Sequence, residues 1–325
     1  MKVLLVGGSG FIGSRLIGVL LERGYEVTNV DLRPSAAHPA VTTLGDVRDL
    51  AAMTSASAGV DVVVNLAAEH RDDVRPLSLY EEVNVGGART LVQAVQAGGV
   101  RRIVFTSSVA VYGLGVPHPS ETSPTAPFNE YGRTKLLAEG VYRGWAEADP
   151  ARGLAIVRSS VVFGEGNRGN VWTLAQQVAS GRFLMVGDGH NRKSMAYVGN
   201  VAAYLAGVIE DGPPGATTTN YADKPDLPTR ELVELLQNAL GSRPRLRRPV
   251  PLALGMAAGH GFDLLARVTG RSFPISAVRI RKFGAETTVD TSRLEASGFQ
   301  RLFSLTDGLR RTLAADLPQH PAVRT

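Results

Sequence analysis

The chain has 325 residues, of which 44% are hydrophobic, and carries a formal net charge of +5. This length is enough for a large buried core, and we expect one large domain with a smaller lobe. Because the chain has no cysteine, disulfides, thiolate metal sites and cysteine nucleophiles are excluded, and a cytoplasmic location is expected.

Short apolar runs alternate with helical patterns along the first half of the chain. The first run, residues 3–6, meets Gly7 too soon for a signal peptide and is interpreted as a strand. Strands are predicted at residues 3–6, 26–30, 60–66, 102–106 and 153–157, and helices at 11–23, 46–55, 80–97 and 131–148. This alternation predicts an α/β fold, in which a doubly wound parallel sheet is covered by helices on both faces.

After residue 165 the pattern loosens, and proline-containing loop signals recur at 213–215, 224–226 and 243–244. We therefore expect residues 1–165 to form the sheet domain and residues 166–325 to form mainly a smaller C-terminal lobe. The chain is expected to return to the sheet near residues 190–215.

The longest apolar stretch covers residues 250–266 and is interrupted by glycines, His260 and Asp263. It does not reach the roughly 20 unbroken apolar residues of a membrane span, so no span is predicted, and core or lid helices are favoured over membrane contact. A basic cluster precedes it, formed by Arg243, Arg245, Arg247 and Arg248. Such a cluster could meet nucleic acid, anionic lipid or a phosphorylated small molecule, but without interleaved aromatic residues nucleic acid is disfavoured.

A glycine-rich loop, Gly7-Gly8-Ser9-Gly10-Phe11-Ile12-Gly13, joins the first predicted strand to the first helix. Glycines at these positions let the backbone turn tightly and approach a pyrophosphate at the positive end of the helix. The next strand ends in Asp31, whose carboxylate would accept from the ribose hydroxyls of NAD and repel the 2′-phosphate of NADP. Arg33, two residues later, leaves NADP open. The motif predicts a Rossmann dinucleotide-binding domain that favours NAD.

Further candidate contacts follow the later strands. Asp46 and Val47 come after a short apolar run, where Asp46 would face an adenine amino group, and Leu66, Ala67 and Ala68 end the strand at 60–66. Carboxyl ends of parallel strands are where such sheets bind ligands, although a helix cap or packed strand end is an alternative for each.

The charged segment 69–73 comes next and would point toward a substrate, so Glu69 and His70 are candidate substrate contacts. The alternative is that this segment is a solvated loop. No metal site is expected, because no second histidine near His70 has metal-site spacing.

Tyr131 and Lys135 lie four residues apart, so a helix stacks the phenol and the ammonium on one face. A phenol is a poor base at neutral pH, and a nearby ammonium favours its ionised form. Tyr131 could then move a proton on and off a sugar or alcohol hydroxyl. On this pair alone, a surface helix with coincidental spacing is the alternative.

Taken together, these motifs resemble the extended short-chain dehydrogenase/reductase family, in its nucleotide-sugar epimerase and dehydratase branch. The resemblance rests on the glycine loop, on Asp46 and on residues 65–68, 106–113, 131–135 and 290–293, and it covers nearly the whole chain. It implies that Ser108 is the catalytic hydroxyl and Tyr131 the acid/base. It also implies that Lys135 holds the nicotinamide ribose and lowers the pKa of Tyr131.

The departures from the family pattern are informative too. Ser108 is followed by Val109 and Ala110, where dehydratases and decarboxylases of the branch carry a carboxylate. Simple hydride transfer, either epimerisation or ketone reduction, is therefore favoured. Val161 stands where the family often has asparagine, which removes one usual substrate contact. Lys193, beside Arg192, stands near the position where relatives commonly place an arginine against a diphosphate.

The candidate residues fall into three groups. The catalytic candidates are Ser108, Tyr131 and Lys135. The cofactor-binding candidates are Gly7, Gly10, Phe11, Ile12, Gly13, Asp31, Arg33, Asp46, Val47, Leu66, Ala67, Ala68, Asn84, Tyr131 and Lys135. The substrate-binding candidates are Glu69, His70, Ser108, Tyr131, Asn170, Arg182, Lys193, Arg279 and Arg281. Those in the lobe are chosen by their similarity in position to the family.

The sequence thus predicts an NAD-dependent nucleotide-sugar epimerase, acting at C4 through a 4-keto intermediate, with a substrate-binding C-terminal lobe. A 4-keto-sugar reductase is the alternative, and a catalytically silent dinucleotide sensor is the alternative of another class. The resemblance also implies a homodimer formed through the helices that begin near Tyr80 and Tyr131. The identity of the nucleotide and of the sugar is left open.

Overall fold

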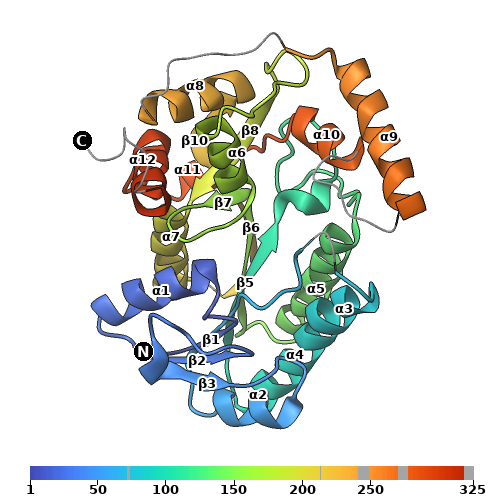
Figure 1. The fold of residues 1–325 in the computed structure, drawn as a ribbon. Coiled ribbons are helices and arrows are strands. Elements are labelled where there is room, and N and C mark those ends of the chain that lie inside the picture. Colours follow the sequence, from blue (N-terminus) through green and yellow to red (C-terminus); the bar gives the residue numbers. More distant parts are fainter. Residues whose placement is uncertain (72–73, 213, 241–248, 270–276, 318–325) are drawn as a thin grey trace.

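The computed structural model describes residues 1–71, 74–212, 214–240, 249–269 and 277–317. A seven-stranded sheet runs through the molecule in the order β3-β2-β1-β4-β5-β6-β9, and each neighbouring pair is parallel (Figure 1). Its strands are β1 (Lys2–Val6), β2 (Glu26–Asp31), β3 (Thr42–Leu44), β4 (Val62–Asn65), β5 (Arg102–Ser108), β6 (Gly153–Ser159) and β9 (Gly215–Tyr221). The predicted doubly wound parallel sheet is confirmed.

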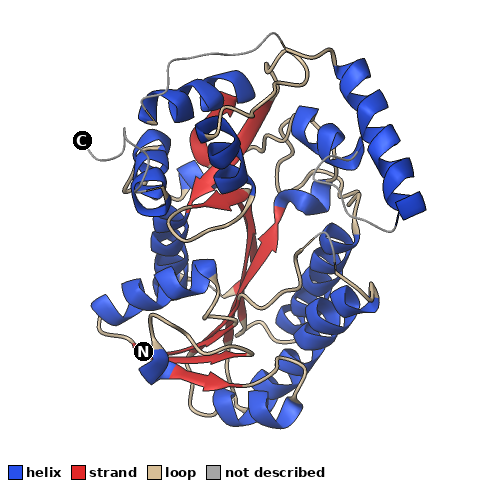
Figure 2. Cartoon of the chain, in the orientation of Figure 1, coloured by secondary structure: helices blue, strands red, loops and turns tan. Residues whose placement is uncertain are grey.

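Helices cover both faces of this sheet (Figure 2). One face carries α1 (Phe11–Glu22) and α7 (Val198–Asp211), and the other carries α2 (Leu50–Ser57), α4 (Gly87–Ala97) and α5 (Glu130–Glu147). The central strands are continuous runs of buried valine and leucine, because a strand covered on both faces has no solvent side to mark with polar residues.

Two predicted helices differ from the observed ones at their starts. The helix expected at 46–55 begins at Leu50, because the Asp49 carboxylate caps it by accepting from the first-turn N–H groups. The helix expected at 80–97 is divided into α3 (Ser78–Tyr80), a π-helical turn η2 (Glu81–Gly86) and α4. A short 3-10 turn, η1 (Pro39–Val41), precedes β3.

The lobe is built on a three-stranded sheet of order β10-β8-β7, in which β8 pairs parallel to β7 and antiparallel to β10. Its elements are β7 (Val161–Phe163), α6 (Asn170–Ala179), β8 (Arg192–Tyr197), β10 (Asp223–Pro228), α8 (Thr229–Ala239), α9 (Leu252–Thr269), α10 (Ala277–Gly284) and α12 (Leu305–Asp316). Within the described ranges, no helix has the length and apolar character needed to cross a membrane.

A segment near the end of the chain contacts the main sheet at its edge strand, β9. The Asn220 side-chain amide donates to the carbonyl of Pro119 at 3.0 Å and to that of Asp290 at 3.1 Å. Next to it, Arg293 of α11 (Ser292–Ala296) donates to the Thr218 carbonyl at 2.9 Å. Three segments that are distant in sequence are therefore joined at the edge strand.

Candidate active site

The glycine-rich loop between β1 and α1 is packed too tightly to hold side chains. A Cβ on Gly7, whose φ is +84°, would lie 2.5 Å from the Ala67 nitrogen, and a Cβ on Gly13 would lie 2.4 Å from the Gly8 Cα. The buried Asn29 side chain accepts from the Gly8 N–H at 2.8 Å and fixes the course of the loop. Asn29 was not among the predicted site residues, although a polar residue among the apolar positions of β2 was an available signal.

Asp31 closes the loop from the end of β2. One carboxylate oxygen accepts from the Ser9 N–H and the other from the Arg33 N–H, each at 3.0 Å, which leaves acceptor capacity on both for ribose hydroxyls. Helix α1 starts after Gly10 without a side-chain cap among the described residues, so its first N–H groups can meet a pyrophosphate. The bare backbone, the uncapped helix end and this carboxylate together fit a bound NAD.

The other cofactor candidates lie at neighbouring strand ends. Arg48 donates hydrogen bonds to the Asp46 carboxylate and holds the pKa of that carboxyl below its usual range. An adenine amino group would therefore share the carboxylate with Arg48. Val47 is buried against Gly87. The segment 66–68 directly follows β4, with Leu66 bonded back to β1 through its N–H.

Asn84 lies in η2 and joins the end of β4 to helix α5. Its side chain accepts from the Glu69 N–H at 2.8 Å, donates to the Glu69 carbonyl at 3.0 Å and donates to Thr134 Oγ1 at 2.9 Å. The π-helical turn places this amide inward, as such turns often do at functional sites. His70, by contrast, is exposed.

Ser108 and Tyr131 are brought together by close packing of α5 on the turn η3 (Val109–Tyr112). The Asn129 side chain caps α5 by accepting from the Gly132 N–H at 2.9 Å. Gly132 approaches η3 so closely that a Cβ there would lie 2.5 Å from the Ala110 carbonyl oxygen. As a result, the half-buried Tyr131 phenol is hydrogen-bonded to the Ser108 side chain.

The electrostatics of this pair correct one expectation. Burial raises the pKa of Tyr131, and the hydrogen bond to Ser108 opposes that rise. Lys135 is 2% exposed, its Nζ lies 4.1 Å from the Phe105 ring centroid, and burial lowers its pKa to about 7, against the opposing charge of Glu139. The expected lowering of the Tyr131 pKa by Lys135 is wrong for this structure, because a buried ammonium that is only partly charged near neutral pH exerts little field.

A buried ion pair lies one helical turn beyond Lys135. Arg158 of β6 donates to both oxygens of the Glu139 carboxylate, at 2.9 and 2.7 Å, and Ser107 donates to the same group at 2.5 Å. The arginine and glutamate side chains are only 4% and 1% exposed. Arg158 also donates to the Tyr112 hydroxyl at 2.7 Å. Neither member of this pair was among the predicted site residues, although an arginine inside an apolar strand was an available signal.

The substrate candidates of the lobe are spread over several elements. Asn170 opens α6 and is exposed, as is Arg182. Lys193 of β8 is half-buried, its Nζ donates to the Ala285 carbonyl at 2.9 Å, and burial lowers its pKa to about 8. The side chains of Arg279 and Arg281 lie outside the described residues, as does the basic cluster at 243–248.

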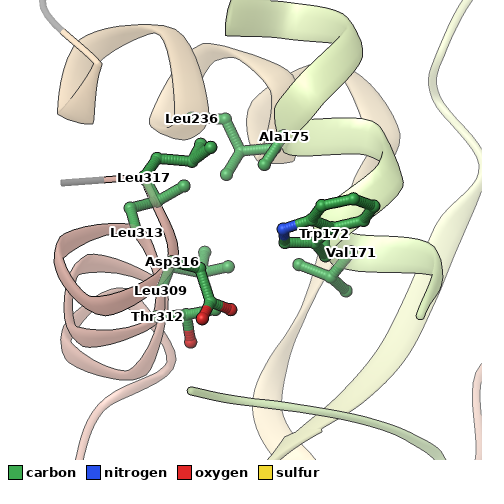
Figure 3. Close-up of a pocket in the computed structure, with 9 residues that line it drawn as sticks. All are labelled: Val171, Trp172, Ala175, Leu236, Leu309, Thr312, Leu313, Asp316 and Leu317. Carbon is green, nitrogen blue, oxygen red and sulfur yellow. The ribbon is translucent and has the colours of Figure 1, made fainter. Parts of the chain in front are cut away.

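A separate cavity lies within the lobe between α6, α8 and α12 (Figure 3). Its lining is mainly apolar, but Trp172 Nε1 and Asp316 Oδ2 are buried there with no hydrogen-bond partner among the described residues. None of the predicted site residues lines this cavity, so it belongs to the packing of the lobe.

Residues 3–221 match the family model described as the NAD dependent epimerase/dehydratase family. The chain belongs to this family. Membership confirms the resemblance drawn from the motifs, the predicted enzyme class and the dependence on NAD.

Several relatives match over nearly the full length of this family member. One is the N-acetyl-alpha-D-glucosaminyl-diphospho-ditrans,octacis-undecaprenol 4-epimerase of Escherichia coli O157:H7, which is 46% identical over 314 residues, covering 96% of this chain and 94% of the relative. Another is the 2-alkyl-3-oxoalkanoate reductase of Stenotrophomonas maltophilia, 29% identical over 97% of this chain and 99% of the relative. The UDP-glucose 4-epimerase of Thermus thermophilus, solved in complex with NAD, has the same fold, with a TM-score of 0.75, 24% identity and coverage of 97% and 98%.

Proposed function

We propose that the protein is an NAD-dependent 4-epimerase of a sugar carried on a diphosphate. The observation that carries the proposal is the contact of Tyr131 with Ser108, next to Val109 and Ala110 and without a neighbouring carboxylate in that turn. Similarity supports the same choice, because the sugar 4-epimerase relative is 46% identical and the reductase relative 29%.

In this proposal Tyr131 removes the proton from the C4 hydroxyl and later returns it, while Ser108 holds the reacting oxygen. When bound, NAD supplies the acceptor for the C4 hydride, which then returns to the opposite face of the sugar. Burial raises the pKa of Tyr131, which makes its ionised form a stronger base toward the C4 hydroxyl proton. Lys135 would bind the nicotinamide ribose, and Glu139 favours its charged form.

The carrier of the sugar is proposed to be a polyprenyl diphosphate, as the printed name of the 46% identical relative indicates for that protein. A nucleoside diphosphate sugar is the second candidate, favoured by the motif resemblance. Both carriers present a diphosphate, and the half-buried Lys193 is suited to bind it as a point charge. Asn170, Arg182 and one of Arg279 or Arg281 are proposed to assist.

The test is turnover by the purified protein, after identification of any retained cofactor. Samples receive either polyprenyl diphosphate-linked N-acetylglucosamine or UDP-N-acetylglucosamine, and the sugars released by hydrolysis are separated by chromatography. We expect the C4 epimer to form from the polyprenyl substrate without net use of NAD. Consumption of NADPH with a 4-keto sugar, and no interconversion, would replace the epimerase by the reductase.

A pair of tyrosine variants separates the enzyme from a silent sensor. Tyr131→Phe is expected to abolish turnover while NAD still raises the melting temperature, because the phenol carries the proton and the glycine loop binds the cofactor. Tyr25→Phe removes a hydroxyl at the turn before β2 and should leave both properties intact. Equal activity of Tyr131→Phe and the wild type would remove Tyr131 from the chemistry.

The cytoplasmic location and the homodimer stay predictions. A dimer through α4 and α5 would cover Leu137, which is 42% exposed on α5. Light scattering that shows only a monomer would contradict it.

A further inference from the structure

Helix α9 presents four leucines to solvent. Leu254 and Leu264 are 61% and 63% exposed, and Leu252 and Leu265 are 47% and 45% exposed. At 100° per residue, positions 254, 257, 258, 261, 264 and 265 share one side of the helix, and each is exposed and uncharged. A continuous apolar face of this kind marks a binding surface more often than a bare solvent face.

The opposite side of α9 packs on the lobe through two glycines. A Cβ on Gly255 would lie 2.5 Å from Val186, and a Cβ on Gly259 would lie 2.8 Å from Ala277, so the glycines allow close contact with the lobe. Asp263 also faces inward, where its carboxylate accepts from the Ala277 N–H at 3.1 Å. A helix that simply covered its own core would have the reverse arrangement, with leucines inward and the carboxylate outward.

The helix is also connected to the proposed diphosphate-binding side of the lobe. Val250, just before α9, donates its N–H to the Met185 carbonyl at 2.8 Å, and α9 packs on α10 (Figure 1). Directly after α10, the Ala285 carbonyl accepts from Lys193 Nζ. The exposed leucine face therefore belongs to the same helix pair that adjoins Lys193.

We propose that the outer face of α9 docks on an anionic lipid bilayer and so brings the site to a substrate anchored there. The docking rests on the proposed polyprenyl substrate, whose hydrocarbon chain stays in the bilayer. Leucines on one face of a helix insert into the interfacial region of a membrane without spanning it. The sequence adds the matching charge, because four arginines between residues 243 and 248 directly precede the helix.

The first test is flotation of the full-length protein with vesicles of phosphatidylglycerol and phosphatidylethanolamine. We expect the wild type to float with them and to bind phosphatidylcholine vesicles more weakly. Leu254→Gln/Leu264→Gln/Leu265→Gln should reduce binding at least tenfold, because three apolar side chains lose their burial in lipid. Leu302→Gln, at a position that is 66% exposed near α12, is the control and should bind like the wild type.

Activity on two forms of one substrate separates docking from the reaction. The triple variant should keep its turnover on a water-soluble, short-chain prenyl diphosphate sugar and lose it on the same sugar with a long chain in vesicles. Loss on both would mean that the substitutions damage the site or the fold, which circular dichroism distinguishes, and would overturn docking as the cause.

The remaining outcomes distinguish docking on lipid from contact with a second copy of the chain, and they test the docking and the proposed function separately. A wild type that epimerises the vesicle-bound sugar without floating overturns the docking alone. A protein that floats through α9 but epimerises neither form keeps the docking and loses the proposed function. If the wild type is a dimer that the triple variant converts to a monomer, with vesicle binding absent in both, α9 contacts a second copy and the lipid proposal fails.

Discussion

Replacement of Glu139 by glutamine tests the buried ion pair that supports the active site. The carboxylate accepts two hydrogen bonds from Arg158 and one from Ser107, in a setting from which water is excluded. Glutamine keeps the shape but removes the charge, and its amide group would face a guanidinium donor. Because Arg158 is then buried without a counter-charge, we expect a loss of about 3–5 kcal/mol in the free energy of unfolding.

Urea denaturation measures that loss directly. With an m-value of about 3 kcal/mol per molar urea, the midpoint should fall by about 1–1.7 M. Glu147→Gln, an exposed glutamate on the same helix, is the matched control and should change stability by less than about 0.5 kcal/mol. Glu139→Gln/Arg158→Met should recover part of the loss, because the unpaired charge is removed with its partner.

The pH profile gives a second readout that a purely structural role would not move. Glu139 raises the pKa of Lys135, so its neutralisation should lower that pKa further and shift the alkaline limb of the activity profile toward lower pH. If Glu139→Gln unfolds at the urea concentration of the wild type and keeps its pH profile, the ion pair has neither the stabilising nor the positioning role assigned to it.

Three further predictions concern the cofactor loop, Lys135 and Lys193. Gly13→Ala should abolish NAD binding in calorimetry because its Cβ would meet the Gly8 backbone at 2.4 Å, whereas Gly18→Ala on the same helix, with 3.8 Å of space, should bind normally. Lys135→Met should abolish turnover yet raise stability at pH 7 by roughly 2–4 kcal/mol. In the unfolded chain Lys135 keeps its proton up to its ordinary pKa of 10.5, and in the folded protein only up to about 7. The stability of the wild type should therefore rise between these two pH values, and its stability difference from Lys135→Met should vanish near pH 10. A stability difference that does not change with pH would refute the low pKa of Lys135. Lys193→Gln should raise KM for the sugar diphosphate about tenfold while kcat is retained. In the wild type, KM should rise as pH passes about 8, because Lys193 then loses its charge, and the variant should lack this rise. An unchanged KM in the variant would exclude Lys193 from the diphosphate site.

Local patterns were sufficient to predict the sheet and the main motifs. The strands β1, β4 and β5 are buried runs with clear ends, and the glycine loop requires the turn that it forms, so both are readable from short segments. Strand β9 was not predicted, because its threonine-rich sequence lacks an apolar run although it completes the sheet. The predicted chemistry likewise came from spacing within one helix.

Properties that depend on packing between distant segments could not be predicted. The partnership of Glu139 with Arg158 joins α5 to β6, and no spacing rule connects the two residues. The direction of the Tyr131 pKa depends on how much water the fold excludes and on how far Lys135 is buried. The outward leucines of α9 were expected to be core or lid because apolar content alone does not show which side of a helix its neighbours cover.

The tie between Asn220 and Asp290 limits how this enzyme can be divided. The segment that matches the family model ends at residue 221, yet the Asn220 amide and the Thr218 carbonyl find partners in Asp290 and Arg293, which lie between the lobe helices α10 and α12 in sequence. A fragment cut after residue 221 would lose these partners at the edge of its sheet. A chimaera that exchanges lobes between relatives should therefore keep the recipient's own residues 286–301 with its sheet, because segments of the sheet and of the lobe alternate along the second half of the chain.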